Sequence, residues 1–146
     1  MLSVANNLSD GMEIAVRVLI AEDDLASRKY ILKILEPFGE CDVTVNGVEA
    51  LDAFLLAIDE LKPYDLICLD IMMPKADGMK VLKTIRQIEK KNGIKDSERI
   101  KIIMLTALND TETIQDSYDL GCEAFVTKPV DSAGLIKIIK KLELIE

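Results

Sequence analysis

Short apolar runs alternate with helix-like patterns along the whole chain, and this alternation is the feature that most restricts its fold. Most of the runs are unbroken by polar residues, as "LICL" and "VRVLIA" show, and such runs are typical of strands buried on both faces. The pattern predicts five strands, over 16–21, 41–45, 66–69, 100–105 and 123–127. Strands that alternate with helices favour a parallel sheet covered by helices on both sides.

A helical pattern follows each predicted strand, because apolar residues recur there every three or four positions. The second helix, for example, is marked by Val48, Leu51, Leu55 and Ile58, and the third spans 78–91 with Met79, Leu82, Ile85 and Ile88 inward. Asn109, Asp110 or Thr111 caps the fourth helix, which stops at Gly121. Asp131 or Ser132 caps the last helix.

Length and charge narrow the class of protein. A chain of 146 residues, 49% of them hydrophobic, makes one domain, here over 16–146, and 1–15 reads as an extension outside the fold. The net charge of −8 disfavours nucleic acid and anionic lipid as partners. No stretch approaches the roughly 18 apolar residues of a membrane span, and the start does not read as a signal peptide.

Histidine is absent, and the three cysteines are widely spaced. The cysteine pattern fits free thiols in a reducing cytosol rather than a disulfide framework or a thiolate metal site. Chemistry within this chain therefore depends on carboxylates, hydroxyls and lysines, without histidine as a base or metal ligand. We expect a cytoplasmic protein.

Polar residues follow four of the predicted strands. The acidic run 22–24 follows the first strand, Asp70 the third, Thr106 and Ala107 the fourth, and Lys128 the fifth. Because ligands of open parallel sheets bind beyond the carboxyl ends of the strands, these groups should converge. Carboxylates about 4 Å apart repel by on the order of 4 kcal/mol at an effective dielectric constant near 20, so we expect Mg²⁺, a cation suited to oxygen ligands, to offset the repulsion.

Such a site suits a phosphoryl group. Mg²⁺ and Lys128 would neutralise its oxygens, the Thr106 hydroxyl and the Ala107 main-chain N–H would donate hydrogen bonds, and the Asp70 carboxylate is a competent nucleophile. Each signal alone has an ordinary explanation, since Asp23 or Asp24 could cap the first helix and Asp70 could begin a turn. Their joint occurrence at successive strand ends favours a site.

These segments resemble the receiver domains of two-component response regulators. The resemblance covers about 17–144 and is carried by "VLIAEDD", "DLICLDIMMPKADGMKVL", "IIMLTA" and "GCEAFVTKPV". It implies an α/β, flavodoxin-like fold, a doubly wound five-stranded parallel sheet with strand order 2-1-3-4-5. It also implies a regulatory phosphoacceptor rather than an enzyme that turns over a substrate.

The resemblance implies a role for each matching residue. Asp70 is the phosphoacceptor, and Mg²⁺ is held by Asp24, Asp70 and the main-chain carbonyl of Met72, with Asp23 acting through water. Lys128 pairs with a phosphoryl oxygen, next to a cis bond before Pro129. Thr106 and Phe125 form the switch.

The resemblance also implies partners. The phosphoryl donor is a histidine kinase or a histidine phosphotransfer protein, and phosphorylation shifts the face made by the fourth helix, fifth strand and fifth helix toward a form that engages an output protein or a second copy of the chain. Three departures matter. The switch aromatic, Phe125, is Phe rather than Tyr and has no hydroxyl to satisfy when buried. The segment 89–101 is lengthened, and Met72 and Leu108 stand where many relatives carry polar groups that orient attacking water, which predicts slow dephosphorylation.

Three other functions remain open at this point. A phosphohydrolase of the haloacid dehalogenase type would also form an aspartyl phosphate, but it normally has a second Asp where this chain has Met72. A flavodoxin-like electron carrier would need a Ser-, Thr- and Gly-rich phosphate loop where this chain has 22–24. An inactive receiver that serves only as a binding module would not need all of the acidic pair, the acceptor, Thr106 and Lys128.

Overall fold

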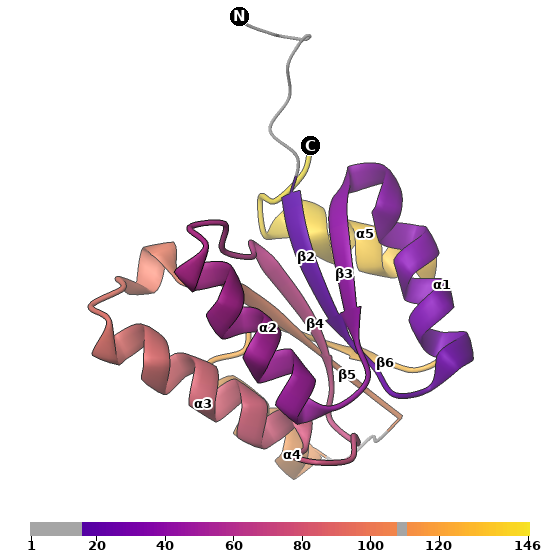
Figure 1. Cartoon of the computed structure of the whole chain (residues 1–146). Helices are drawn as coiled ribbons and strands as arrows, with labels where there is room; N and C mark the ends of the chain where they lie inside the picture. The colour runs from indigo at the N-terminus through magenta and orange to yellow at the C-terminus, as the bar shows by residue number, and fades with distance from the viewer. Residues whose placement is uncertain (1–15, 108–110) are drawn as a thin grey trace, which may run out of the picture.

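The expected strands and helices are all present in the computed structural model, which describes residues 16–107 and 111–146 (Figure 1). The strands are β2 (Val16–Ala21), β3 (Gly39–Thr44), β4 (Leu66–Asp70), β5 (Lys101–Thr106) and β6 (Ala124–Thr127). The helices are α1 (Leu25–Leu35), α2 (Gly47–Asp59), α3 (Gly78–Lys91), α4 (Thr111–Asp119) and α5 (Ser132–Lys141), with short 3₁₀ turns η1 (Glu36–Phe38) and η2 (Asp96–Glu98). The expected extension over 1–15 and the candidate caps Asn109 and Asp110 lie outside the described residues.

All strand pairs in the five-stranded sheet are parallel, and the spatial order is β3-β2-β4-β5-β6. This is the predicted order 2-1-3-4-5, so the doubly wound α/β fold is confirmed. The direction in which successive strands are added reverses between β2 and β4. In such sheets the point of reversal opens a crevice at the carboxyl ends of the strands, and the residues after β2 and β4 lie there.

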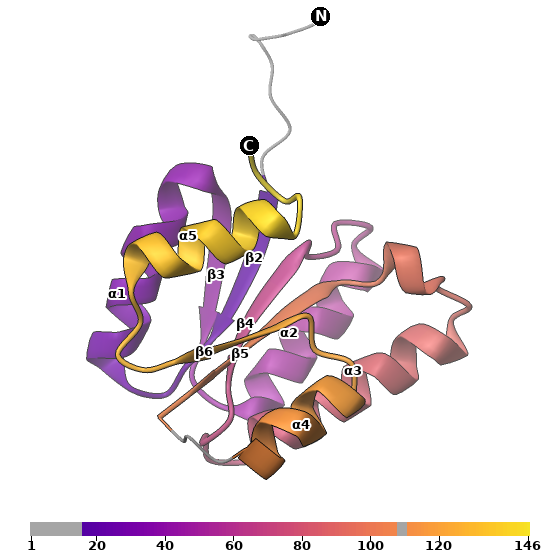
Figure 2. The ribbon, with the colours of Figure 1, turned by 180° about the vertical axis from the view of Figure 1, so that it is seen from behind.

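Two hydrophobic clusters cover the two faces of the sheet. Alternate residues of each strand point to opposite faces, so Leu19 and Ile67 pack with α2 and α3, whereas Ile20 and Cys68 pack with α1 and α5. The two views show this division of the helices between the faces (Figure 2). All five side chains of β4 are buried, because β4 lies inside the sheet with helices on both sides. Within the described residues no helix is both long and apolar enough to cross a membrane.

Capping side chains fix where four of the helices begin. Asp24, Asn46, Asp77 and Asp131 each accept a hydrogen bond from the main-chain nitrogen three residues later, which satisfies an otherwise unpaired donor. The predicted cap Asp131 is thus confirmed. Gly121, with φ +102°, follows α4 as the predicted stop, because this left-handed conformation favours glycine.

The second helix lies where expected, but of the four residues that mark it only Leu51 and Ile58 pack, partly buried, against the core. Val48 and Leu55 are exposed. The helix instead buries Gly47, Ala50, Phe54 and Ala57. Small side chains at three of these positions let the helix axis approach the sheet closely, so the larger aliphatic residues lie toward solvent.

A network of buried charges ties α3 to the amino ends of β5 and β6. The Arg86 guanidinium donates to the main-chain oxygens of Ile100 and Gly121 and pairs with the carboxylates of Glu89 at 2.7 Å and Glu123 at 2.8 Å. The second oxygen of Glu89 accepts from the Ile100 nitrogen. The lengthened segment after α3 is therefore anchored at both ends, on the edge of the sheet opposite the strand ends that carry the candidate site.

Replacing Arg86 should be strongly destabilising. Arg86→Met leaves the carboxylates of Glu89 and Glu123 buried without their common partner, and such a loss costs about 3 to 5 kcal/mol. We expect this decrease in the free energy of unfolding in urea titrations. Lys83→Met changes an exposed residue of the same helix and is the control, expected to change stability little. A decrease for Arg86→Met no larger than that of the control would contradict the role given to the network.

Candidate functional site

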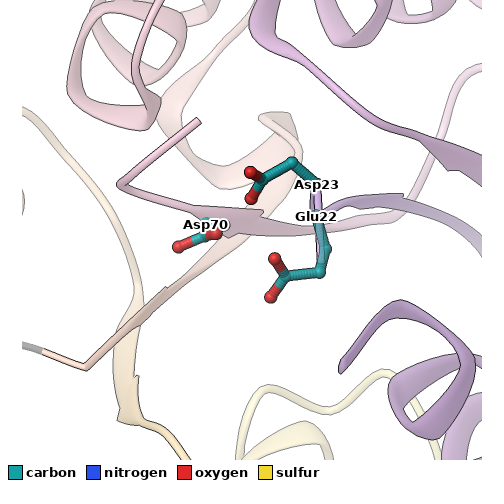
Figure 3. Close-up of side chains that lie close together, drawn as sticks. All are labelled: Glu22, Asp23 and Asp70. Carbon is teal, nitrogen blue, oxygen red and sulfur yellow. The ribbon is translucent and has the colours of Figure 1, made fainter. Parts of the chain in front are cut away.

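Three carboxylates meet where the direction of strand addition reverses. Glu22 and Asp23 directly follow β2, and Asp70 ends the adjacent strand β4 (Figure 3). Oxygen atoms of the three side chains lie within 4.8 Å of one another. Glu22 and Asp70 are buried and Asp23 is exposed, so the group opens to solvent on one side. The expectation that carboxylates converge at the end of β4 is met by this geometry.

Asp24 is not part of this group, which differs from the expectation that it lies beside Asp70 as a metal ligand. Its side chain accepts a hydrogen bond from the Ser27 main-chain nitrogen at 2.9 Å and caps α1. That hydrogen bond lowers the pKa of Asp24. The physical reason is the position of the helix start: because α1 begins at Leu25, the preceding residue has to supply the cap.

Glu22 lies in this group where Asp24 was expected, although the sequence predicted no role of its own for it. Its side chain is completely buried, with one oxygen accepting from the Asp24 main-chain nitrogen at 3.1 Å. The signal for it was available, since three consecutive acids follow β2 and the last of them is needed as a cap. Counting back from that cap leaves Glu22 and Asp23 as the acidic pair.

Lys128 neutralises part of this charge. Its ammonium lies 3.1 Å from Oδ2 of Asp70 and also contacts the buried Oε1 of Glu22. Lys128 follows β6, and its bond to Pro129 is cis, as predicted. One ammonium thus bridges two buried carboxylates that come from adjacent strands.

Burial disfavours the charged forms of both Asp70 and Lys128, but their neighbours compensate the two charges differently. For Asp70, burial and then the proximity of Glu22 raise the pKa to about 7, although Lys128 acts in the other direction. For Lys128, burial alone would lower the pKa, but the hydrogen bonds to Glu22 and Asp70 raise it above its ordinary value. The lysine is therefore fully charged at neutral pH, whereas the Asp70 carboxylate lacks sufficient compensating charge.

The remaining predicted residues lie in β5 or directly after it, in β6 and in the loop that follows Asp70. Thr106 ends β5, the strand next to β4, and is fully buried, while Ala107 beside it is exposed. The Met72 main-chain nitrogen donates to Oδ1 of Asp70 at 3.3 Å, and the Met72 side chain is 65% exposed. Phe125 lies in β6 opposite Met104, half-buried against the cluster that α2 and α3 cover. Leu108 lies outside the described residues.

The donor set fits a hard divalent cation. Three carboxylates offer oxygen ligands within reach of one another, and Mg²⁺ is bound by such ligands while retaining several waters. The one ammonium present cannot balance three negative charges. A cation at the open side, next to Asp23, would complete the compensation and leave room for a further anionic group.

A family model described as the response regulator receiver domain matches residues 18–140. The chain is 33% identical over 132 residues to hybrid signal transduction histidine kinase B of Dictyostelium discoideum, a match that covers 86% of this chain but 6% of that protein. The chain thus spans only a small part of that kinase, and about half (55%) of the length of another relative, probable transcriptional regulator ycf29 of Porphyra purpurea.

Two solved structures are similar along most of their length. One is a complex of CheX, CheY, BeF₃ and Mg²⁺ from Borrelia burgdorferi, with a TM-score of 0.73 and 26% identity over 89% of this chain and 90% of that chain. The other is the co-crystal structure of the Saccharomyces cerevisiae histidine phosphotransfer protein Ypd1 with the receiver domain of its downstream response regulator Ssk1, with a TM-score of 0.76 and 27% identity over 90% of this chain and 92% of that chain.

Removing the negative charge of Asp70 should stabilise the metal-free protein at neutral and higher pH. Because the pKa of Asp70 is raised on folding, the folded state binds this proton more tightly, and stability falls as pH rises from about 4 to about 7. Asp70→Asn has no carboxyl group to titrate at this position, so its free energy of unfolding does not fall in this way. In the presence of a chelator at pH 8, we expect this variant to be more stable than wild type by on the order of 2 kcal/mol.

The advantage should shrink as pH falls below the ordinary pKa of 3.8, where Asp70 becomes protonated in both folded and unfolded wild type. The free energy of unfolding at several pH values, with Asp77→Asn as an exposed control, tests this. A stability difference that does not depend on pH would show that Asp70 carries no unfavourable charge.

Proposed function

The chain belongs to the family of response regulator receiver domains, and from that premise we propose that it accepts a phosphoryl group on Asp70 and thereby regulates a partner. Receiver domains of this family act in two-component phosphorelay signalling as regulatory phosphoacceptors. The observation that carries the proposal is the contact of one half-buried ammonium, that of Lys128, with both Glu22 and Asp70 at the open carboxyl edge of the sheet.

We propose that Glu22, Asp23, Asp70 and the main-chain carbonyl of Met72 hold Mg²⁺. The assignment replaces Asp24 with Glu22 and rests on the grouping of the three carboxylates. Bound Mg²⁺ supplies positive charge for the phosphoryl oxygens and for the crowded carboxylates. The Mg²⁺ in the similar Borrelia burgdorferi complex supports this proposal.

The transfer itself requires a nucleophile, charge compensation and a donor. A carboxylate oxygen of Asp70 attacks phosphorus, the bond between phosphorus and the imidazole nitrogen of a phosphohistidine breaks, and the electron pair remains on that nitrogen. Lys128 is already at hydrogen-bonding distance from Asp70 and pairs with a phosphoryl oxygen. The Ala107 main-chain N–H donates to another phosphoryl oxygen.

The donor that we propose is a histidine kinase or a histidine phosphotransfer protein. Two findings support it: the histidine kinase among the relatives and the similar complex that contains Ypd1. This chain has no histidine, so the phosphohistidine belongs to a separate segment or protein. The output partner, in this proposal, binds the face of the chain that changes when the phosphoryl group is attached.

That switch, in our proposal, couples the buried Thr106 hydroxyl to Phe125. Thr106 moves toward the phosphoryl group, and Phe125, which is half-buried on the same side of the sheet as α3, moves inward. The change alters the face made by α4, β6 and α5 for an output protein or a second copy of the chain. Phe125 has no hydroxyl, so its inward position leaves no polar group unsatisfied.

Phosphorylation should depend on both Asp70 and Mg²⁺. After incubation with acetyl phosphate and Mg²⁺, we expect the intact mass of wild type to rise by one phosphoryl group. The gain should be absent in chelator and absent in Asp70→Asn. Asp24→Asn is the matched variant, expected to retain the gain because its side chain caps α1 rather than joining the carboxylate group. Equal labelling of Asp70→Asn and wild type would refute the acceptor assignment.

Loss of the phosphoryl group should be slow, because hydrolysis needs an oriented water and the exposed Met72 thioether beside Asp70 is a poor hydrogen-bonding group. Met72→Asn supplies an amide there and should speed phosphate release several-fold. Lys75→Asn places the same side chain on the same loop, where the φ of 55° suits Asn, and should leave the rate unchanged. The rate is followed by intact mass after removal of the donor, and equal rates for both variants would contradict this role of Met72.

A further inference from the structure

We propose that the connection between β3 and α2, residues 44–47, is a positioning element that sets the separation of the two halves of the metal and phosphoryl site. The inference rests on the proposed function. One half of the site is the acidic pair after β2. The other is Asp70 with the loop 71–77, which carries the Met72 carbonyl. Main-chain contacts join this connection to both halves.

The loop after Asp70 has a main chain that needs outside support. Lys75 and Ala76 have φ values of 55° and 92°, in the left-handed region that residues other than glycine adopt at a cost. On one side the loop is fixed by α3, because the Gly78 nitrogen donates to the Ile71 oxygen at 2.8 Å. A Cβ at Gly78 would lie 2.3 Å from the Asp70 main-chain oxygen. The acceptor and the start of α3 are thus in direct contact.

The first turn of α2 supports the loop on its other side. The Gly47 nitrogen donates to the Pro74 oxygen at 3.4 Å. A Cβ at Gly47 would lie 2.1 Å from the Ala76 main-chain oxygen and 2.8 Å from its Cβ. Gly47 is buried, and the Asn46 side chain caps the helix by accepting from the Glu49 nitrogen at 2.9 Å. The main chain of the helix therefore contacts the main chain of the loop directly, and a methyl group on Gly47 would not fit between them.

The same connection also holds the acidic pair. The Glu22 nitrogen donates to the Thr44 oxygen at 3.1 Å. The Thr44 hydroxyl, itself buried, donates to the Ile20 oxygen at 3.2 Å. Within four residues, then, the chain contacts the main chain of Glu22 and the main chain of the loop after Asp70. A change in the position of Gly47 alters the distance between the groups proposed to bind Mg²⁺.

Gly47→Ala is the direct test. The added methyl group pushes the loop away from α2, and we expect the Mg²⁺ dissociation constant, measured by NMR titration, to rise about tenfold, as is typical when the support of metal ligands is lost. Labelling by acetyl phosphate at limiting Mg²⁺ should slow in parallel. Gly47→Ala combined with Ala76→Gly, which removes one of the two clashing groups and frees the loop, should recover part of the affinity.

Gly39→Ala is the matched control. Gly39 lies at the end of β3 that is remote from the connection, and a Cβ there would lie 1.9 Å from the main-chain oxygen of Val16 in β2. The substitution should therefore lower the melting temperature without changing the Mg²⁺ dissociation constant. If Gly47→Ala does not fold, Asn46→Ala loosens the same turn by removing its cap without adding atoms, and we expect the same direction of change.

Two outcomes would overturn the inference alone. One is Mg²⁺ binding unaffected by the folded Gly47→Ala, or by Asn46→Ala in its place, while wild type binds Mg²⁺ and is labelled. The other is an equal loss of Mg²⁺ affinity in Gly39→Ala. Absence of both Mg²⁺ binding and labelling in wild type would instead overturn the proposed function and this inference together.

Discussion

The contact of one ammonium with two buried carboxylates is the interaction on which the rest of the site depends. Lys128 reaches Glu22 and Asp70 from a third strand end, so the three segments are held together by charge as well as by the sheet. The compensation is incomplete, because three carboxylates share the region with one lysine. In the proposed function, this uncompensated negative charge favours the binding of a cation and, with the cation, of a phosphoryl group.

Much of the fold was accessible from sequence because the strongest signals agree with one another. Apolar runs, capping residues and the stop at Gly121 each point to the same alternating pattern, and the strand boundaries follow within one or two residues. The face of α2 was not accessible. Val48 and Leu55 form a convincing apolar stripe, yet the close approach of the helix to the sheet selects Gly47, Ala50 and Ala57, a preference that only the packed structure reveals.

The positions of the candidate residues agree with the sequence prediction except in the acidic run. Asp70, Thr106 and Lys128 lie at strand ends as expected, because topology alone decides their position there. In the acidic run, by contrast, position depends on the first turn of α1, and the cap takes Asp24 while Glu22 turns into the site. The buried pairing of Arg86 with Glu89 and Glu123 was equally hidden, because charged residues near a polar loop normally lie in solvent.

The position of β4 inside the sheet limits how a modification of Asp70 could change the structure of this molecule. Main-chain amides of a strand that is paired on both sides and buried on both faces exchange with solvent only when the whole domain opens. We therefore expect Asp70 to end one of the slowest-exchanging strands, and the proposed modification there is not expected to act by loosening that strand. Any structural effect of a modification at that carboxylate therefore has to be transmitted by the loops and helices that contact the strand ends.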